Sequence, residues 1–269
     1  MQAAVVDVGA RYDALAATYD RPNYDPRSAL YWEIVERLTW ELSAPFLPAP
    51  GVDAPVLDAG GGTGKWALRF AELGHHVSLL DVSAGMLEAA REKVNATPRR
   101  DQVSLHRGTI ESLPFSDATF AFTFCDGDPL SYCHTTYRGA LRELVRVTRP
   151  GAFLVIGVDN AAITASDLVV AAALREFQGT GTARCPYGMP VHAFTPVEVS
   201  ELARSVSCSL AGLYGKPLFW SRVSAVLARM AGERPPRAWA DSIVAEQLWL
   251  NHAGYGSAGD HLHIVLRKG

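Results

Sequence analysis

The chain has 269 residues, of which 48% are hydrophobic and 20% charged, and its net charge at neutral pH is −3. These values are ordinary for a globular protein with a sizeable core. The slight acidic excess argues against a general surface for nucleic acid or anionic membranes, which would need an excess of basic residues. The cysteines show neither CxxC nor zinc-finger spacing, so we expect no metal site and no disulfide framework. They are Cys125, Cys133, Cys185 and Cys208.

The sequence carries no pattern typical of a membrane or secreted protein. No stretch approaches the roughly 18 uncharged apolar residues that a spanning helix needs. The first residues, MQAAVVDVGARYD, lack the basic start and long apolar run of a signal peptide. Free thiols also suit a reducing compartment. We therefore expect a cytoplasmic protein that binds neither a membrane nor nucleic acid.

Two helices and a linker are expected before the first strand. The first helix, residues 12–20, is short and aromatic. The second, residues 26–42, has Leu30, Ile34, Leu38 and Leu42 four residues apart, which predicts one apolar face. Residues 45–55 contain four prolines and a glycine and read as a linker into a new unit.

Strands and helices then alternate, which indicates a parallel sheet with helices on both faces. Strands are predicted at residues 56–58, 77–80, 102–106, 119–125 and 153–158. Helices are predicted at residues 64–73, 83–95 and 137–147, and a turn at Pro150–Gly151. The later pattern is less regular. We expect a helix at 161–177, a Gly/Pro-rich loop at 179–190, a helix opening at Thr195 and a strand at 207–214. Two further helices between residues 217 and 252 and a closing strand at 261–266 complete the prediction.

A glycine loop joins the first of these strands to the following helix. Gly60, Gly62 and Gly64 lie where an α/β sheet binds ligands, at the carboxyl end of a strand and the start of a helix. A phosphate-binding Walker loop would need glycine at Ala59 and Ser or Thr at Trp66. A dinucleotide loop would need glycine where Lys65 stands. The spacing therefore disfavours an ATPase and an NAD-dependent oxidoreductase.

The loop and its surroundings, VLDAGGGTGKWA at residues 56–67, closely resemble motif I of class I S-adenosylmethionine-dependent methyltransferases. The resemblance implies a Rossmann-like, seven-stranded, mostly parallel sheet with N-terminal helices and a helical lid. It implies a lid segment at residues 1–50, a cofactor-binding core at 51–160, lid or acceptor-binding helices and remaining strands at 161–259, and a final strand at 260–269. All four belong to one globular unit.

The resemblance also assigns cofactor contacts. Asp58 is expected to attract the cofactor's ammonium group, and Asp81, at the end of the next strand, to accept the ribose hydroxyls. Val82 would pack on the adenine, with Met86 as a soft apolar neighbour. Residues 108–115 resemble the family's adenine-reading segment with Thr109 in place of its acid. The whole cofactor-binding set is Tyr19, Asp58, Gly60, Gly61, Gly62, Gly64, Asp81, Val82, Met86, Thr109, Ile110, Glu111, Asp126 and Gly127.

The acceptor side is less clearly marked. Residues 126–132 resemble motif IV of the family, which lies near the transferred methyl group, and this favours Asp128, Tyr132 and the neighbouring His134 as catalytic residues. His192 follows the Gly/Pro-rich loop and is a further candidate base or acceptor-binding group. We interpreted His252, His261 and His263 as surface or strand histidines. The aromatic region at residues 213–255 is compatible with an acceptor pocket, a core or a homodimer interface.

The resulting hypothesis is a methyltransferase that moves a methyl group from S-adenosylmethionine to a nitrogen or oxygen of a small molecule. Three alternatives stay open. One is a non-catalytic protein that binds the same cofactor, since binding and catalysis are separate properties. The others are a protein methyltransferase and an RNA methyltransferase.

Overall fold

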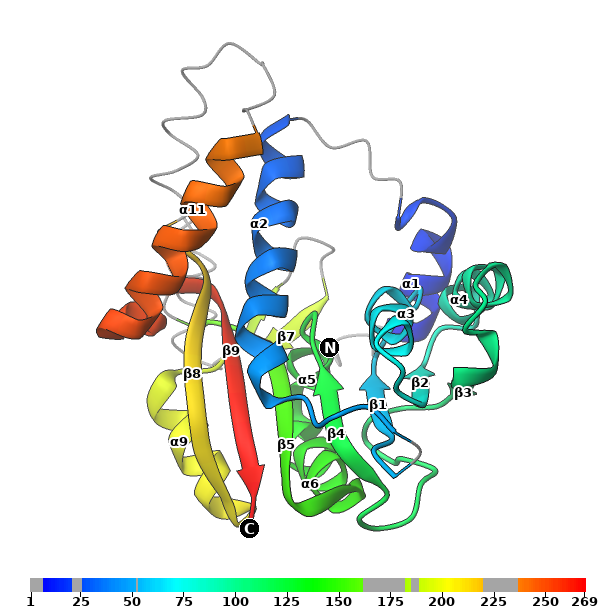
Figure 1. Ribbon diagram of the computed structural model, residues 1–269. Helices are drawn as coiled ribbons and strands as arrows, with labels where there is room; N and C mark the ends of the chain where they lie inside the picture. Colours follow the sequence, from blue (N-terminus) through cyan, green and yellow to red (C-terminus); the bar gives the residue numbers. More distant parts are fainter. Residues whose placement is uncertain (1–6, 21–25, 52, 162–181, 185–188, 220–236) are drawn as a thin grey trace, which may run out of the picture.

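The computed structural model describes residues 7–20, 26–51, 53–161, 182–184, 189–219 and 237–269 (Figure 1). One seven-stranded sheet has the strand order β3-β2-β1-β4-β5-β9-β8. Only β9 runs against its neighbours, so the sheet is mostly parallel, as the Rossmann-like prediction required. The strands are β1 Val56–Ala59, β2 Val77–Asp81, β3 Val103–Arg107, β4 Phe120–Cys125, β5 Thr148–Asp159, β8 Cys208–Leu218 and β9 Gly259–Lys268.

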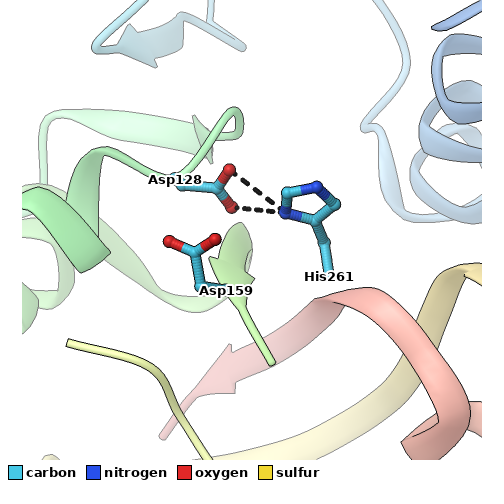
Figure 2. Close-up of side chains that lie close together, drawn as sticks. All are labelled: Asp128, Asp159 and His261. Atoms are coloured by element: carbon cyan, nitrogen blue, oxygen red, sulfur yellow. Dashed lines mark hydrogen bonds and ion pairs between the residues drawn. The ribbon is translucent and has the colours of Figure 1, made fainter. Parts of the chain in front are cut away.

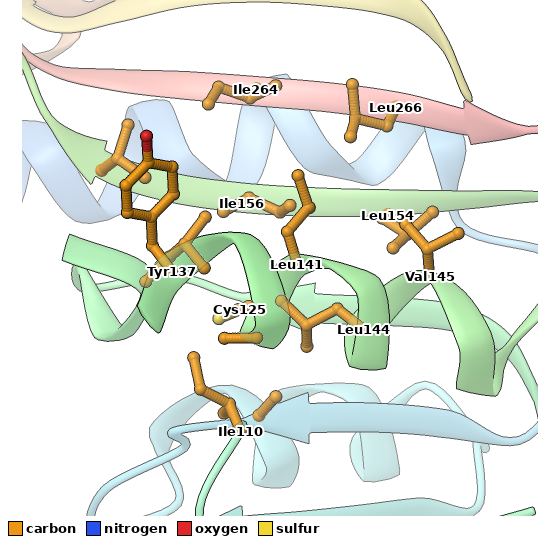
Figure 3. Close-up of a cluster of buried hydrophobic side chains, with 14 of the residues drawn as sticks. Ile110, Cys125, Tyr137, Leu141, Leu144, Val145, Leu154, Ile156, Ile264 and Leu266 are labelled. Atoms are coloured by element: carbon orange, nitrogen blue, oxygen red, sulfur yellow. The ribbon is translucent and has the colours of Figure 1, made fainter. Parts of the chain in front are cut away.

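Helices cover both faces of this sheet, and the alternation of side chains along each strand explains why. Successive residues of a strand point to opposite faces. Leu154 and Ile156 of β5 therefore join one buried cluster, whereas Val155 between them joins another. The first cluster lies under α6 (Tyr137–Val147) and α9 (Pro196–Ser205), and Figure 3 shows Leu141 and Leu144 of α6 packed against the sheet. The second lies under α3 (Lys65–Glu72) and α4 (Ala84–Ala96).

The long N-terminal helix packs as its spacing predicted. Leu30, Ile34, Leu38 and Leu42 of α2 (Pro26–Ser43) are all buried. They form a third cluster with Ala240 and Val244 of α11 (Arg237–Leu250), which stands beside α2 in Figure 1. Part of the aromatic C-terminal region thus contributes to a core, while Trp239 and Trp249 remain exposed on α11.

Shorter helices complete the described chain. The N-terminal segment forms α1 (Val8–Leu15) and a 3-10 turn, Ala16–Thr18. After β4 the chain forms α5 (Pro129–Tyr132) and another 3-10 turn, His134–Thr136. Further 3-10 turns lie at Ala44–Phe46, Arg100–Gln102 and Gly256–Ala258, and a π-helical turn at Asn251–Tyr255. No helix of the described residues is long and apolar enough to cross a membrane. The predicted helix at 161–177 and residues 220–236, within the region expected to hold two helices, lie outside the described residues, apart from Ala161.

Two local predictions were wrong. The turn expected at Pro150–Gly151 is part of β5, where the register with β4 shifts between Phe120 and Phe122 and Gly151 has a φ of 78°. Such an irregularity lets a strand carry a proline and a glycine. The loop expected at 179–190 contains β6 (Thr182–Arg184), which pairs with β7 (Pro190–His192). Pro190 is the first residue of β7, a position where the missing N–H is tolerated.

Candidate active site

The glycine loop lies at the carboxyl end of β1 and is held by its neighbours. Gly60 and Gly61 donate backbone hydrogen bonds of 2.7 and 3.1 Å to the carbonyl of Leu80. Gly60 has a φ of 75°, and a Cβ on it would lie 2.5 Å from the ring of Pro129 at the start of α5. Gly62 has a φ of 54°, and no atom lies within 4 Å of where its Cβ would be. Gly60 thus permits packing onto α5, while Gly62 leaves room at the open side of the loop.

Asp58 is the least satisfied polar side chain near this loop. Its residue is 1% exposed, and Oδ2 has no hydrogen-bond partner among the described residues. Burial, with the charges of Asp81 and Asp126, raises the pKa of Asp58 to about 7, against the opposing effect of a backbone hydrogen bond from Ala67. Leaving a buried carboxylate unpaired is costly. The residue therefore suits a positively charged ligand group beside the loop.

Asp81 braces the loop from the end of β2. Its Oδ2 accepts a hydrogen bond of 2.9 Å from the Gly62 N–H, and its Oδ1 accepts one of 2.8 Å from the Ser83 N–H at the start of α4. Burial raises the pKa of Asp81, and these backbone donors counteract the rise. A carboxylate has about four lone-pair directions, which is more than these backbone donors use and leaves capacity for a ligand hydroxyl. Asp81 therefore holds the glycine loop in place, in addition to its predicted contact with the ribose.

The N-terminal segment is tied onto the same region by two carboxylates. Asp13 of α1 accepts hydrogen bonds from Ser83 Oγ at 2.5 Å and from the Gly85 N–H at 2.8 Å. Asp20 accepts one of 2.8 Å from Thr63 Oγ1 and forms a 2.7 Å ion pair with Lys93. The segment thus contacts both the glycine loop and the start of α4, where a lid would lie.

Tyrosine rings extend this contact toward motif IV. Tyr12 lies edge-on to Tyr19 and to Tyr132 of α5, with ring centroids 6.2 and 5.8 Å apart. Tyr19 is 44% exposed. Tyr24, an aromatic residue of the N-terminal segment that the resemblance implies is a lid, lies outside the described residues.

The predicted adenine side contains both exposed and buried members. Val82 is 39% exposed, whereas Met86 and Ile110 are buried. Thr109 Oγ1 donates a hydrogen bond of 3.1 Å to Glu111, which also accepts a hydrogen bond from Thr136. Glu111 therefore connects this segment to the turn that follows α5.

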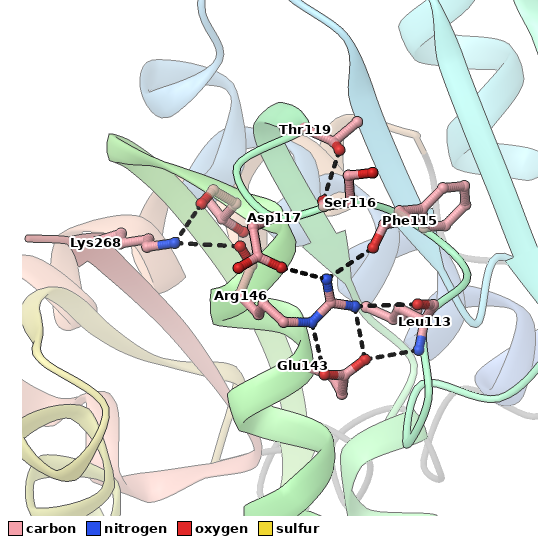
Figure 4. A network of polar contacts seen from close by, with 9 residues as sticks. Leu113, Phe115, Ser116, Asp117, Thr119, Glu143, Arg146 and Lys268 are labelled. Atoms are coloured by element: carbon pink, nitrogen blue, oxygen red, sulfur yellow. Dashed lines mark hydrogen bonds and ion pairs between the residues drawn. The ribbon is translucent and has the colours of Figure 1, made fainter.

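Arg146 of α6 holds the segment that continues from Glu111. Its guanidinium donates to the carbonyls of Leu113 and Phe115 at 3.1 and 2.7 Å (Figure 4). It also pairs with Glu143 and Asp117. Because the planar guanidinium is bonded on several sides, it fixes the path of this loop beside the site.

Three titratable side chains meet at the other end of the site. Asp128 follows β4, Asp159 ends β5, and His261 lies near the start of β9 (Figure 2). His261 Nδ1 lies 3.2 and 3.1 Å from the two Asp128 oxygens. Each of the three residues offers one atom that could bind a metal ion, an imidazole nitrogen or a carboxylate oxygen, and these atoms all lie within 4.8 Å of one another. Both ends of the candidate site thus carry acidic groups at the same edge of the sheet.

This acid–histidine cluster, Asp128, Asp159 and His261, has unusual protonation. Burial opposes the charged imidazole, but the charge and hydrogen bond of Asp128 outweigh it, with help from Asp159, and raise the pKa of His261 to about 9. Burial, with repulsion from Asp128, raises the pKa of Asp159 to about 7. The group therefore exchanges protons close to neutral pH.

Of the other predicted catalytic residues, Tyr132 ends α5 and donates a backbone hydrogen bond of 3.2 Å to the carbonyl of Asp128. His192 stacks on Tyr137 with ring centroids 4.2 Å apart, and its Nε2 lies 2.8 Å from Glu198 Oε1. The structure thus pairs His192 with α9 rather than with Asp128. His134 begins the 3-10 turn after α5 and has a φ of 47°.

Sequence reasoning missed Asp159, His261 and Lys216. Asp159 and His261 stand directly opposite one another in the antiparallel pair β5–β9. Lys216 of β8 forms an ion pair with Asp126, which was predicted as a cofactor contact. The polar residues in the apolar closing strand, HLHIVL, were the available signal, but they do not reveal which strand lies beside them.

Comparisons with known proteins agree with this geometry. Residues 56–151 match the family model described as a methyltransferase domain. A malonyl-[acyl-carrier protein] O-methyltransferase from Erwinia pyrifoliae is 37% identical over 147 residues, covering 51% of this chain and 48% of the relative. A ubiquinone/menaquinone biosynthesis C-methyltransferase from Pectobacterium carotovorum is 33% identical over 151 residues, covering 54% of this chain and 56% of the relative. The chain spans about half the length of these curated relatives.

The likeness of fold extends beyond the residues that match in sequence. The CcbJ methyltransferase from Streptomyces caelestis superposes with a TM-score of 0.63 over 98% of this chain and 100% of that one, at 16% identity. The strand order and glycine loop, together with these likenesses, define a Rossmann-like methyltransferase fold. Residues 56–151 thus resemble a methyltransferase domain in sequence, and the fold is that of solved methyltransferases.

Proposed function

We propose that the chain binds S-adenosylmethionine at the carboxyl ends of β1, β2 and β4 and transfers its methyl group to a nitrogen or oxygen of a small molecule. The observation that carries the proposal is the unpaired Oδ2 of Asp58, buried beside a glycine loop. A buried carboxylate of this kind fits the ammonium of the cofactor's amino acid portion. When bound, the cofactor supplies a methyl group already activated by its positively charged sulfur.

The remaining cofactor assignments follow from position. Asp81 has capacity left for a ribose hydroxyl after its backbone hydrogen bonds. Val82 offers an exposed apolar surface next to it. The buried side chain of Met86 supports this region from within the core. The N-terminal segment, tied down by Asp13 and Asp20, excludes water from the cofactor side.

The acid–histidine cluster supplies the acceptor chemistry. An acceptor hydroxyl or ammonium must lose a proton before or during methyl transfer, and a nearby base assists this loss. His261, with a pKa of about 9, already carries a proton at neutral pH. Asp159, with a pKa of about 7, is therefore the better proton acceptor, while the charged His261 holds Asp128 in place. We infer an acceptor that carries an N–H or O–H group.

Two measurements test this proposal. Calorimetric titration with S-adenosylmethionine, S-adenosylhomocysteine and NAD should show binding of the first two; binding of NAD alone would refute the proposal. Transfer from methyl-labelled cofactor should then be measured with benzylamine, phenol and benzoate, which share a ring but differ in the nucleophile. We expect label in the amine or the phenol. Exclusive labelling of benzoate would refute the acceptor class, and cofactor binding without transfer to any small molecule or macromolecule would favour a regulatory protein.

Two further experiments test whether the acid–histidine cluster accepts a proton or binds a metal ion. Asp159→Asn should slow transfer to the accepted probe by at least about tenfold without weakening S-adenosylhomocysteine binding. Asp101→Asn, a change at an exposed residue, serves as the matched control. Repeating the wild-type assay with a chelator and then with Mg²⁺ or Mn²⁺ asks whether the three donor atoms of the cluster hold a metal. Activity that requires a divalent ion would replace the proton-acceptor role with metal binding.

A further inference from the structure

Lys216 is a buried lysine to which the proposed function assigns no role. It lies in β8, with 2% of the residue exposed, opposite His261 in the register of β8 with β9. Its Nζ pairs with Asp126 and donates a hydrogen bond of 2.6 Å to Thr39 Oγ1 of α2. An ammonium group removed from water is costly unless it is paired. Lys216 and Asp126 therefore depend on each other.

The carboxylate of Asp126 is fixed from several elements at once. It lies over Gly157 of β5, where any Cβ would clash with Asp126 Oδ1. His263 Nδ1 of β9 lies 3.9 Å from the same oxygen, and Thr39 Oγ1 donates a hydrogen bond of 3.5 Å to Oδ2. Burial alone would raise the pKa of Asp126, but the charge of Lys216 and the contact with His263 bring it well below the usual range. Asp126 is therefore an ionised anchor inside the fold.

The anchor is followed by a turn with unusual backbone angles. Gly127 has a φ of 80° and Asp128 a φ of 68°. A residue with a side chain rarely adopts the left-handed region, and it does so where its surroundings hold it there. Asp126 holds one side of this turn, and the contact of Asp128 with His261 holds the other. The turn aims the Asp128 carboxylate at His261.

We propose that Lys216 is a positioning residue, which, through its ion pair with Asp126, holds the Gly127–Asp128 turn so that Asp128 contacts His261. The consequence for methyl transfer rests on the proposed function, whereas the placement of Asp128 does not. Loss of Lys216 frees Asp126 to move, relaxes the turn at Asp128 and separates Asp128 from the imidazole. The glycine loop with Asp58 and Asp81 keeps its own contacts, so cofactor binding is spared.

The pKa of His261, measured by NMR of its ring protons in the ligand-free protein, distinguishes this role from a purely electrostatic one. Asp128, Asp159 and Lys216 are the charged groups that act on His261. The Lys216 charge lowers the pKa of His261, so losing that charge alone would raise it. Loss of the Asp128 contact would lower it instead. If Lys216 positions Asp128, the pKa of His261 should therefore fall in Lys216→Met, whereas the loss of the Lys216 charge alone would raise it.

The experiment compares Lys216→Met, the double variant Lys216→Met/Asp126→Asn, and Lys268→Met as control. Lys268 lies in β9, where its Nζ bonds the carbonyls of Arg146 and Thr148 away from the cluster. We expect a His261 pKa lower by at least about one unit in both Lys216 variants and unchanged in the control. In Lys216→Met, transfer should fall by at least about tenfold, with S-adenosylhomocysteine affinity within about threefold of wild type.

An unchanged or raised His261 pKa in a folded Lys216 variant overturns the proposal. If Lys216→Met leaves Asp126 unpaired and fails to fold, the double variant decides, because it removes both charges of the pair. The NMR result stands even if S-adenosylhomocysteine does not bind, and such a failure would refute the proposed function instead. If the His261 pKa falls in the double variant but methyl transfer stays normal, the placement of Asp128 is not needed for catalysis.

Discussion

His261 lies directly opposite Asp159 in the antiparallel pairing of β5 with β9. This pairing brings an imidazole from the last strand to a carboxylate from the middle of the chain, beside Asp128 at the end of β4. The reversed direction of β9 is decisive, because its first residues then meet the carboxyl ends of the parallel strands. The edge that binds ligands in such sheets therefore gains residues from the C-terminal segment.

The first prediction concerns the pH dependence of stability. The pKa of His261 is about 9 in the fold and near 6.5 when unfolded. Its protonation therefore stabilises the fold fully below about pH 6.5, and this contribution is lost as pH rises through about 9. We expect wild type to lose roughly 2 to 3 kcal/mol more unfolding free energy than His261→Gln between about pH 6 and pH 10. Denaturant unfolding at both pH values measures it.

His76→Gln is the control for this prediction, since His76 is exposed at the start of the segment leading into β2. It should lose as much stability as wild type over the same pH range. Equal losses in wild type and His261→Gln would show that His261 is not charged in the fold. Asp159 changes the unfolding free energy in a lower pH range than His261. Because its pKa is raised in the fold, it lowers stability as pH rises from about 4 through about 7.

The fold could be predicted from the sequence because its signals are local. The four-residue spacing of Leu30 to Leu42 describes one helix face, and the alternation of strands with helices restricts the topology to few arrangements. The glycine spacing disfavours two other nucleotide loops, because Ala59, Lys65 and Trp66 stand where those loops need other residues. The errors at Pro150–Gly151 and at residues 179–190 arose where pairing with other strands overrides local turn propensity.

The acid–histidine cluster could be predicted only in part. Asp128 was found because it lies within a contiguous motif. His261 and Lys216 were not, because their roles depend on the order β5-β9-β8, which no local pattern encodes. Asp126 illustrates the same limit. Its motif predicts a cofactor contact, which stays a prediction, but could not reveal its buried partners from α2, β8 and β9.

The second prediction concerns Asp58. Its pKa of about 7 in the fold, against the usual 3.8, means that the cost of Asp58 to the ligand-free protein grows as pH rises from about 4 through about 7 and is constant above that. Wild type should therefore lose roughly 2 to 3 kcal/mol more unfolding free energy than Asp58→Asn between about pH 5 and pH 8. The same variant should bind S-adenosylmethionine at least about tenfold more weakly. Denaturant unfolding and calorimetry test the two effects, and unchanged affinity would remove Asp58 from the cofactor site.

The third prediction concerns Asp81. Asp81→Ala removes both the predicted ribose acceptor and the acceptor for the Gly62 N–H. We expect affinity for S-adenosylhomocysteine to fall by more than about tenfold in a folded protein. Asp81→Asn keeps one oxygen, so it should lie between wild type and Asp81→Ala. Calorimetry provides the affinities and circular dichroism checks the fold, with Asp101→Ala as a control at an exposed carboxylate. Wild-type affinity in Asp81→Ala would place the ribose elsewhere.

The fourth prediction concerns the N-terminal segment as a lid. Asp13 and Asp20 tie it to Ser83, Gly85 and Thr63, which flank the predicted cofactor position. Closure by a lid slows ligand escape more than it changes ligand contacts. Asp13→Asn/Asp20→Asn should therefore speed S-adenosylhomocysteine dissociation by about tenfold and leave association within about threefold. Stopped-flow fluorescence measures both rates.

The control for the lid is Glu88→Gln, which removes an exposed ion pair with Arg91 on α4. It changes charge near the same helix without touching the N-terminal segment, so both rates should match wild type. Equal dissociation rates in wild type and the Asp13/Asp20 double variant would show that the segment packs on α4 without covering the ligand. A fall in association alone would indicate that the two carboxylates attract the ligand electrostatically, because such attraction acts mainly on the rate of encounter.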